Sequence, residues 1–234
     1  MSDDSHSQYV SDSSYPLLAF PGGAVAMTRL VTTPRKEPRQ ARSQATVEAI
    51  LTATARVLVK HGYDHASTNR IAEAAGVSVG SLYQYFPTKE ALVAALIDRH
   101  MTEMTAMLET NIEVLRGAPL PIATRALVKL MLKAHAQNPK LHKIFSEQVP
   151  RVGRMNRFYE IERRMGERIR AYLEGHAKEL RTKNLDLSVF IVVCVVEALT
   201  HMTVVDHPGR FDEEELTDEI TSLVLRYVMK DPPD

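Results

Sequence analysis

Apolar residues recur every three to four positions along most of this chain, which is the spacing of amphipathic helices. Neither the period-two alternation of strands nor an internal repeat competes with that pattern. The chain is therefore predicted to be all-α, with about nine helices. The first helix is predicted at about 43–61 and is followed by Gly62, a favoured helix stop. Its inner face is predicted to carry Val47, Ile50, Ala53, Val57 and Leu58.

Two short helices joined by a tight turn are predicted next. Ser67 or Thr68 can cap the first of them, and Gly76 ends it with the left-handed backbone that helix ends favour. Ser78 caps the second, and Pro87 stops it. This pattern predicts a helix-turn-helix. The inner face of its second helix is predicted to hold Leu82 and Phe86.

A second, larger group of helices follows. The fourth helix starts at about Lys89 and is too long to belong only to the small domain, so we expect it to connect two domains. Gly and Pro residues separate the later helices, and the last one opens with the acidic run 212–215, which complements the helix dipole. The later helices are predicted to end at about 136, to follow Pro139, and to lie at about 153–181, at about 187–205 and from 212 onward.

The predicted helix at 187–205 is apolar on nearly all sides and must be covered on nearly all sides. A monomer covers such a helix poorly, so a homodimer is expected. Its longest unbroken apolar run, 189–196, is shorter than the roughly 20 residues that span a bilayer, so no membrane helix is expected. The single cysteine, Cys194, indicates a reducing compartment, and the cytoplasm is the expected location.

Charge is unevenly distributed although the formal net charge is zero. Residues 1–28 contain three acids and no Lys or Arg, whereas residues 29–70 contain eight bases and three acids. Such a basic block is typical of a surface that binds phosphates. We expect 1–40 to be a disordered and basic extension, and Met27 offers an alternative translation start. The bases of this arm would track DNA phosphates or enter the minor groove; alternatively, they belong to a solvated linker. They are Arg35, Lys36, Arg39 and Arg42.

The residues around the helix-turn-helix resemble the DNA-binding domain of the tetracycline-repressor-like (TetR/AcrR) family of bacterial transcription regulators. The match covers about a quarter of the chain at many spaced positions, which is more specific than a generic helix-turn-helix. It is carried by Ile50, Leu51, Ala53, Gly62, Tyr63, Ser67, Thr68, Ile71, Ala72, Ala75, Gly76, Val77, Ser78, Gly80, Ser81, Leu82, Tyr83, Tyr85, Phe86, Lys89, Glu90, Ala91 and Leu92.

The resemblance implies a homodimeric repressor that a small-molecule ligand releases from a near-palindromic DNA operator, without a cofactor. After the extension at 1–40, which departs from the family pattern, it implies a helix-turn-helix DNA-binding domain at 41–88 and a helical effector-binding and dimerisation domain at 89–230. A DNA-binding regulator without an effector is the alternative. An enzyme on this fold is not expected, because no spacing joins Cys194, Glu197 and His201 as nucleophile, base and orienter.

The resemblance also assigns the DNA-binding residues. The second helix of the motif would enter the major groove, and the two flanking positions would meet phosphates. Packing of the tyrosines, a helix cap at Thr68 and a solvated charge at Lys89 are the alternatives. Only Gln84 on this helix is a strong base reader, so DNA shape is expected to contribute. The expected DNA-binding residues are Thr68, Ser78, Val79, Gly80, Ser81, Tyr83, Tyr85 and Lys89.

An apolar ligand pocket is implied in the second domain, although plain core packing is the alternative for each lining residue. Glu197 and His201 lie four residues apart on one helix face, and a buried carboxylate there needs a partner. That partner would be the ligand or an Arg in the dimer interface. No metal site is expected, because the histidines lack ligand spacing. The candidate ligand-binding residues are Met104, Leu108, Phe145, Phe158, Tyr159, Glu197 and His201.

Overall fold

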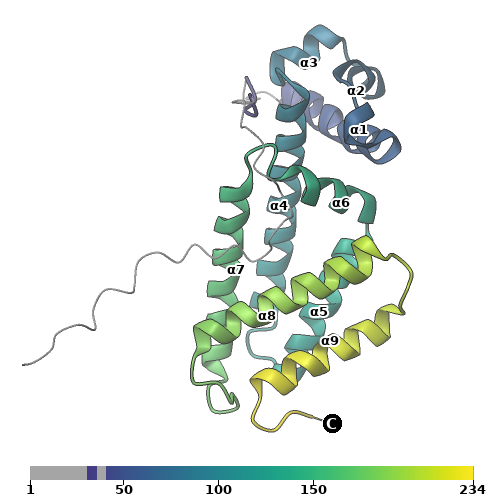
Figure 1. Ribbon diagram of the computed structural model, residues 1–234. Helices are drawn as coiled ribbons and strands as arrows, with labels where there is room; N and C mark the ends of the chain where they lie inside the picture. The colour runs from purple at the N-terminus through teal and green to yellow at the C-terminus, as the bar shows by residue number, and fades with distance from the viewer. Residues whose placement is uncertain (1–30, 36–40, 234) are drawn as a thin grey trace, which may run out of the picture.

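The computed structural model describes residues 31–35 and 41–233, and within them it is built from helices (Figure 1). The all-α prediction is confirmed. The predicted extension at 1–40 and the alternative start at Met27 lie mostly or wholly outside the described residues. The helices are α1 (Ala41–His65), α2 (Thr68–Ala75), α3 (Val79–Tyr85), α4 (Lys89–Val114), α5 (Leu120–Ala136), α6 (Pro139–Gln148), α7 (Met155–Gly175), α8 (Leu185–Thr200), the π-helix η1 (His201–Asp206) and α9 (Glu213–Val228).

Local capping explains where the helix-turn-helix begins and ends. Of the two candidate caps, Ser67 is the one used: its hydroxyl accepts from the backbone N–H of Arg70 at 3.3 Å. Gly76 ends α2 with φ of 68°, and Ser78 accepts from the N–H of Ser81 at 3.0 Å to start α3. α1 runs on to His65, past the predicted stop. The stop signal is nevertheless real, since Gly62 takes a non-helical φ of 74° inside α1.

One apolar core joins the helix-turn-helix to the rest of the molecule. It contains Leu82 and Phe86, as predicted, and the first half of α4 contributes Leu92 and Leu96 to it. Beyond these residues α4 continues down the molecule beside α7 (Figure 1). α6 adds Phe145 to the same core, so two helices outside the motif are packed against it.

The other end of the molecule is formed by α5, α7, α8 and α9. α5 and α9 lie against each other, and α8 contacts α5, α7 and α9 (Figure 1). α7 ends at Gly175 instead of about Arg181, so the predicted end was wrong. The imidazole of His176 bonds the carbonyl of Ala118 at 3.2 Å, and this tertiary contact fixes the chain where it leaves the helix.

The helix after α7 differs from its prediction in two ways. It passes from α-helix into the π-helix η1 at His201, which the apolar pattern did not predict. In addition, α8 and η1 together form a helix, Leu185–Asp206, that is long and apolar enough to cross a membrane, with a mean hydropathy of 2.1. The unbroken apolar run of eight residues was therefore too short a stretch from which to judge whether this helix could span a membrane. In the most apolar 18-residue stretch of this helix, only 22% is buried within the chain, so the helix keeps a large uncovered face.

Candidate DNA-binding surface and ligand cavity

The outer face of α3 is exposed at the end of the molecule formed by the helix-turn-helix (Figure 1). Val79 and Tyr83 are 37% and 39% exposed and lie on the same short helix. Ser78 and Gly80 are exposed beside them, and the Ser81 hydroxyl lies 2.8 Å from that of Ser78. The predicted DNA-facing residues of this helix thus form one continuous surface.

Tyr83 is held in place by the neighbouring helix. Its hydroxyl lies 3.0 Å from the Thr68 hydroxyl at the start of α2. The bond orients the tyrosine ring but leaves the ring exposed. Packing within the small domain, which was the alternative role for Tyr83, therefore explains its hydroxyl contact but not its exposed ring. Because Ser67 is the cap, the Thr68 hydroxyl is engaged by Tyr83 and not by the α2 backbone.

Tyr85 and Lys89 lie at the border of this surface and make more structural contacts. Tyr85 is half-buried against the core, and its carbonyl accepts from the N–H of Arg35 at 2.8 Å. The Lys89 ammonium donates to the carbonyl of Tyr63 at 2.9 Å and lies 4.1 Å from the centre of that ring. Lys89 is therefore not the freely solvated charge of the alternative interpretation, although its ammonium has three donors and this carbonyl uses one of them.

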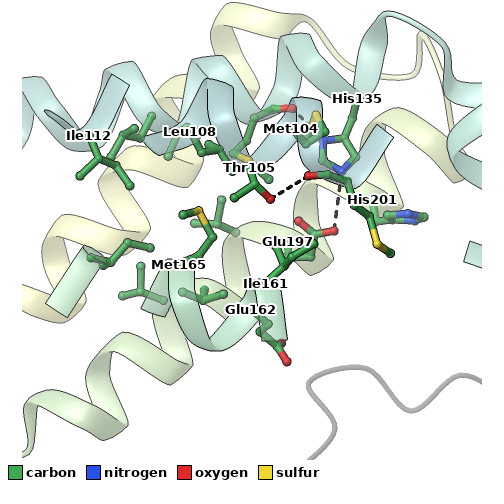
Figure 2. A pocket seen from close by; sticks show the side chains of 18 of the residues that line it. Met104, Thr105, Leu108, Ile112, His135, Ile161, Glu162, Met165, Glu197 and His201 are labelled. Carbon is green, nitrogen blue, oxygen red and sulfur yellow. Dashed lines mark hydrogen bonds and ion pairs between the residues drawn. The ribbon is translucent and has the colours of Figure 1, made fainter. Parts of the chain in front are cut away.

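A cavity of about 300 Å³ is lined by residues of α4, α5, α6, α7, α8, η1 and α9. Six of the seven candidate ligand residues line it, and Figure 2 shows Met104, Leu108, Glu197 and His201 among them. Tyr159 does not line it, although the adjacent Phe158 does. The six lining residues are Met104, Leu108, Phe145, Phe158, Glu197 and His201.

Glu197 has a partner that the sequence did not indicate. Its carboxylate lies 3.6 Å from Nε2 of His135, while Nδ1 of that ring bonds the Met131 carbonyl at 2.9 Å. Burial opposes charge on both side chains. The mutual attraction outweighs burial, so the pKa of His135 is raised and the pKa of Glu197 is lowered. The carboxylate that we expected to pair with a ligand or with an Arg of a second subunit has the His135 imidazole beside it.

Three more histidines gather around this pair. The ring of His142 lies 4.4 Å from that of His135 and 4.5 Å from that of His100, and His201 lies 5.9 Å from His135. Burial is the main cause that lowers the pKa of His100 to about 4 and of His142 to about 3, with repulsion from His135 next. These rings are consequently neutral near pH 7. Sequence spacing missed the group because its members come from α4, α5, α6 and η1.

The histidines are close together but do not form a metal site. Within the described residues, no group of three or more His, Cys, Asp or Glu side chains has an arrangement that could hold a metal ion. The rings of His135 and His142 are tilted by 30° with their centres 4.4 Å apart, so they contact each other as packed rings. The cluster is instead a polar end wall of the cavity.

Glu162 is a further polar residue of the cavity that the sequence did not single out. Burial, followed by the charge of Glu197, raises the pKa of Glu162 to about 7. Burial and the nearby Glu162 also raise the pKa of the Cys194 thiol, which disfavours a reactive thiolate. The apolar spacing of α7 gave no sign of Glu162, because its importance comes from the α8 residues that face it.

Comparison with known proteins assigns both ends of the molecule. Residues 50–96 match the model of bacterial regulatory proteins of the tetR family. Residues 119–227 match the tetracyclin repressor-like C-terminal domain. Both matches agree with the resemblance carried by the helix-turn-helix residues.

Individual relatives are similar over parts of the chain. The nucleoid occlusion factor SlmA of Haemophilus ducreyi is 27% identical over 50% of this chain and 55% of its own length. The transcriptional repressor KstR of Mycolicibacterium smegmatis is 33% identical over 39% of this chain and 44% of its own. The chain thus spans about half the length of these curated relatives.

A solved structure extends the likeness to the whole fold. The fatty acid degradation regulator FadR of Bacillus halodurans superposes with a TM-score of 0.63 over 81% of this chain and 97% of its own, at 20% identity. At that identity the likeness concerns the fold alone. With a family match at each end and a shared fold across both, the chain belongs to the tetR family of bacterial regulatory proteins.

Proposed function

We propose that this protein is a cytoplasmic, homodimeric transcriptional repressor that a small, largely apolar molecule releases from DNA. The observation that carries the proposal is the position of Phe145, which belongs both to the core of the helix-turn-helix and to the wall of the cavity. A molecule that fills the cavity must press on a residue packed against the DNA-binding end. This direct contact favours the ligand-responsive regulator over the effector-independent one.

DNA binding is assigned to the exposed face of α3, with Thr68 and Lys89 placed for phosphates. Two copies related by a two-fold axis would present two α3 helices to successive major grooves, about 34 to 36 Å apart. The operator should therefore be a near-palindrome. Val79, Gly80 and Tyr83 would supply close contact and stacking surface, and DNA shape would supply part of the specificity.

The second copy is argued from the uncovered face of α8 and α9. Phe190 is 40% exposed and Leu223 is 50% exposed, and the apolar helix Leu185–Asp206 has little cover within the chain. Two such faces from two subunits would form a four-helix interface and remove them from water. This reading explains a strongly apolar helix without placing it in a membrane.

The ligand would act through α4 and α6. The first half of α4 is buried in the helix-turn-helix core at Leu92 and Leu96, and its second half lines the cavity at Met104 and Leu108. α6 contacts α1 on one side and η1 on the other. A ligand that fits only one arrangement of these helices changes the separation of the two α3 helices, with an effect limited by its differential affinity for the two states.

Repression is favoured over activation because KstR, a curated relative, is named a transcriptional repressor.

The domain division at 41–88 and 89–230 stays a prediction. α4 and α6 are the helices that would transmit a change at the cavity to the DNA-binding domain. An enzyme is disfavoured by the protonated state of Cys194, the one candidate nucleophile considered above.

Selection of bound fragments from the source genome tests the proposal. The purified protein should enrich a small set of near-palindromic fragments at moderate salt, and Tyr83→Ala should lose the enrichment while keeping its fold by circular dichroism. Val114→Ala, at a side chain of α4 that is 78% exposed and lies on neither proposed surface, is the matched control for expression and folding. Absence of any preferred fragment with the wild-type protein would overturn the proposal.

A further inference from the structure

The cavity wall has carboxylates but no strong base. Among the described residues that line it, none is Lys or Arg, and the acids are Glu162 and Glu197. The remaining wall is mostly aliphatic, methionine and aromatic, with the histidine cluster at one end. The chemistry of a bound molecule is therefore restricted by the charges that this wall can and cannot match.

An anionic head group would find no free positive partner here. The imidazole of His135, whose pKa is raised by Glu197, is already 3.6 Å from that carboxylate. His100 and His142 are uncharged near pH 7, since burial lowers the pKa of each to about 4 and about 3. A carboxylate or phosphate buried in the cavity would lose its hydration without gaining an ion pair, which is strongly unfavourable.

A positive head group would instead meet two carboxylates in a lining that has no Lys or Arg. Glu162, with a pKa of about 7, is partly charged at neutral pH; it makes no ion pair with any residue in the described part of the chain and lies at the lower edge of the side chains in Figure 2. The Glu197 carboxylate borders the interior of the cavity near Thr105, with His135 as its one ion-pair partner among the described residues (Figure 2). One carboxylate thus reaches inside while the other lies at the border.

We infer that the effector of this protein is a lipophilic cation, an apolar body with a protonated amine or quaternary ammonium, held by Glu197 with Glu162 nearby. The inference rests on the proposed function and adds the chemical class of its ligand. Methionine and leucine side chains of α4 and α7 would cover the apolar body. Phe145 and Phe158 line the same space and offer ring faces, which attract cations.

Four probes that share a ten-carbon tail test the inference: decylamine, decyltrimethylammonium, decanol and decanoate. Their binding to the full-length dimer is measured by titration calorimetry at pH 7, below the concentrations at which they form micelles. Both cations should bind at least about tenfold more tightly than decanoate, with decanol between them, since one ion-pair contact corresponds to about a tenfold change.

The Glu197→Gln variant keeps the shape of the side chain and removes its charge. It should lower the affinity for the cations by about tenfold and leave the affinity for decanol unchanged. A role in packing alone would weaken all four probes equally. Glu162→Gln should reduce cation binding by a smaller factor. Glu160→Gln is the matched control, because Glu160 is exposed on α7 and paired with Arg157 at 3.0 Å.

Decanoate binding as tightly as the cations, absence of cation binding, or an equal loss of decanol binding in Glu197→Gln would each overturn the inference. Binding of the genome-selected DNA is measured on the same samples without probe. If the DNA is bound but the cations are not, the ligand class is wrong and the regulator remains. If no DNA is preferred, the regulator is wrong, while the ranking of the probes still reports on the cavity.

Discussion

The two ends of this molecule differ in how tightly their side chains are packed. At the DNA-binding end, Ile71, Leu82 and Phe86 are at most 2% exposed and fill a small core completely. At the other end, the helices from α4 to α9 leave a cavity of about 300 Å³ between methionine, aliphatic and histidine side chains. A tight core keeps one shape, whereas a wall of flexible side chains around a space can adjust to a ligand. The difference is that of a rigid DNA-binding end and an adaptable ligand-binding end.

The largest effect is expected at the surface that would join two copies. Phe190→Glu places a charge on the apolar face of α8 and should convert a dimer to monomers. DNA affinity should fall by about 100-fold or more, because two linked half-site contacts become one. Sedimentation velocity and fluorescence anisotropy measure both effects. Val114→Glu, at a side chain that is 78% exposed on α4, should change neither. A dimeric Phe190→Glu protein with normal DNA affinity would place the interface elsewhere.

The packing contrast itself is tested by truncation at both ends. Phe86→Ala should lower the free energy of unfolding by about 3–5 kcal/mol, because it empties a filled core. Leu108→Ala should cost only about 1–2 kcal/mol, because that side chain already borders a space and loses fewer contacts. Urea unfolding at pH 7 measures the two values. Equal losses would mean that the cavity end is packed as tightly as the DNA-binding end.

The histidine cluster should make the cavity end sensitive to acid. Folding lowers the pKa of His142 from 6.5 to about 3, so below pH 6.5 the unfolded chain binds a proton that the folded protein excludes. Stability is therefore lost as the pH falls, by about 2 kcal/mol between pH 6.5 and 5 for this residue. His142→Asn should remove that part of the loss.

The comparison is made by urea unfolding of wild type and His142→Asn at pH 7 and pH 5. Groups that face His142 and also titrate, His100, His135 and His201, are present in both proteins and cancel in the difference. His65→Asn, at an exposed position of α1, should leave the acid sensitivity intact. The same slope in wild type and His142→Asn would show that this imidazole is not excluded from protonation.

The smallest change in stability is expected at Gly80. A Cβ there would come no closer than 3.9 Å to the nearest atom, the Ser78 hydroxyl, so alanine fits the free protein. Alanine is also the better helix former by about 1 kcal/mol, and Gly80→Ala should match or exceed the wild type in stability. If α3 lies closely against DNA, the added methyl group should still lower DNA affinity by about tenfold. Unchanged DNA affinity would remove Gly80 from the contact surface.

The sequence predicted the DNA-binding end well because its signals are local. Ser78, Gly76 and Pro87 fix helix ends through their own backbone and nearest neighbours, and the buried spacing of Leu82 and Phe86 follows from one short helix. The cavity depends on contacts between distant segments. Spacing brought together Glu197 and His201, but it could not reveal that His100 and His142 come beside them from α4 and α6.

The differences from prediction lie between α7 and η1. Tyr159 was grouped with Phe158, but only Phe158 lines the cavity. α7 ends early, at Gly175, where His176 makes a tertiary contact with Ala118 that no local pattern encodes, and the apolar spacing did not predict the π-helix at His201. The capacity to span a membrane was judged from the eight-residue apolar run alone, whereas the whole helix Leu185–Asp206 has a mean hydropathy of 2.1.

The most direct test fills the cavity without any effector. Leu108→Trp adds a large side chain to the wall, and Ala106→Trp, on an exposed position of α4, is its control. DNA affinity for a genome-selected fragment is measured by fluorescence anisotropy on folded dimers. Leu108→Trp should bind at least about tenfold more weakly than wild type, because it mimics the ligand-bound state. If it binds DNA like wild type and the Ala106→Trp control, occupation of the cavity does not control the DNA-binding end.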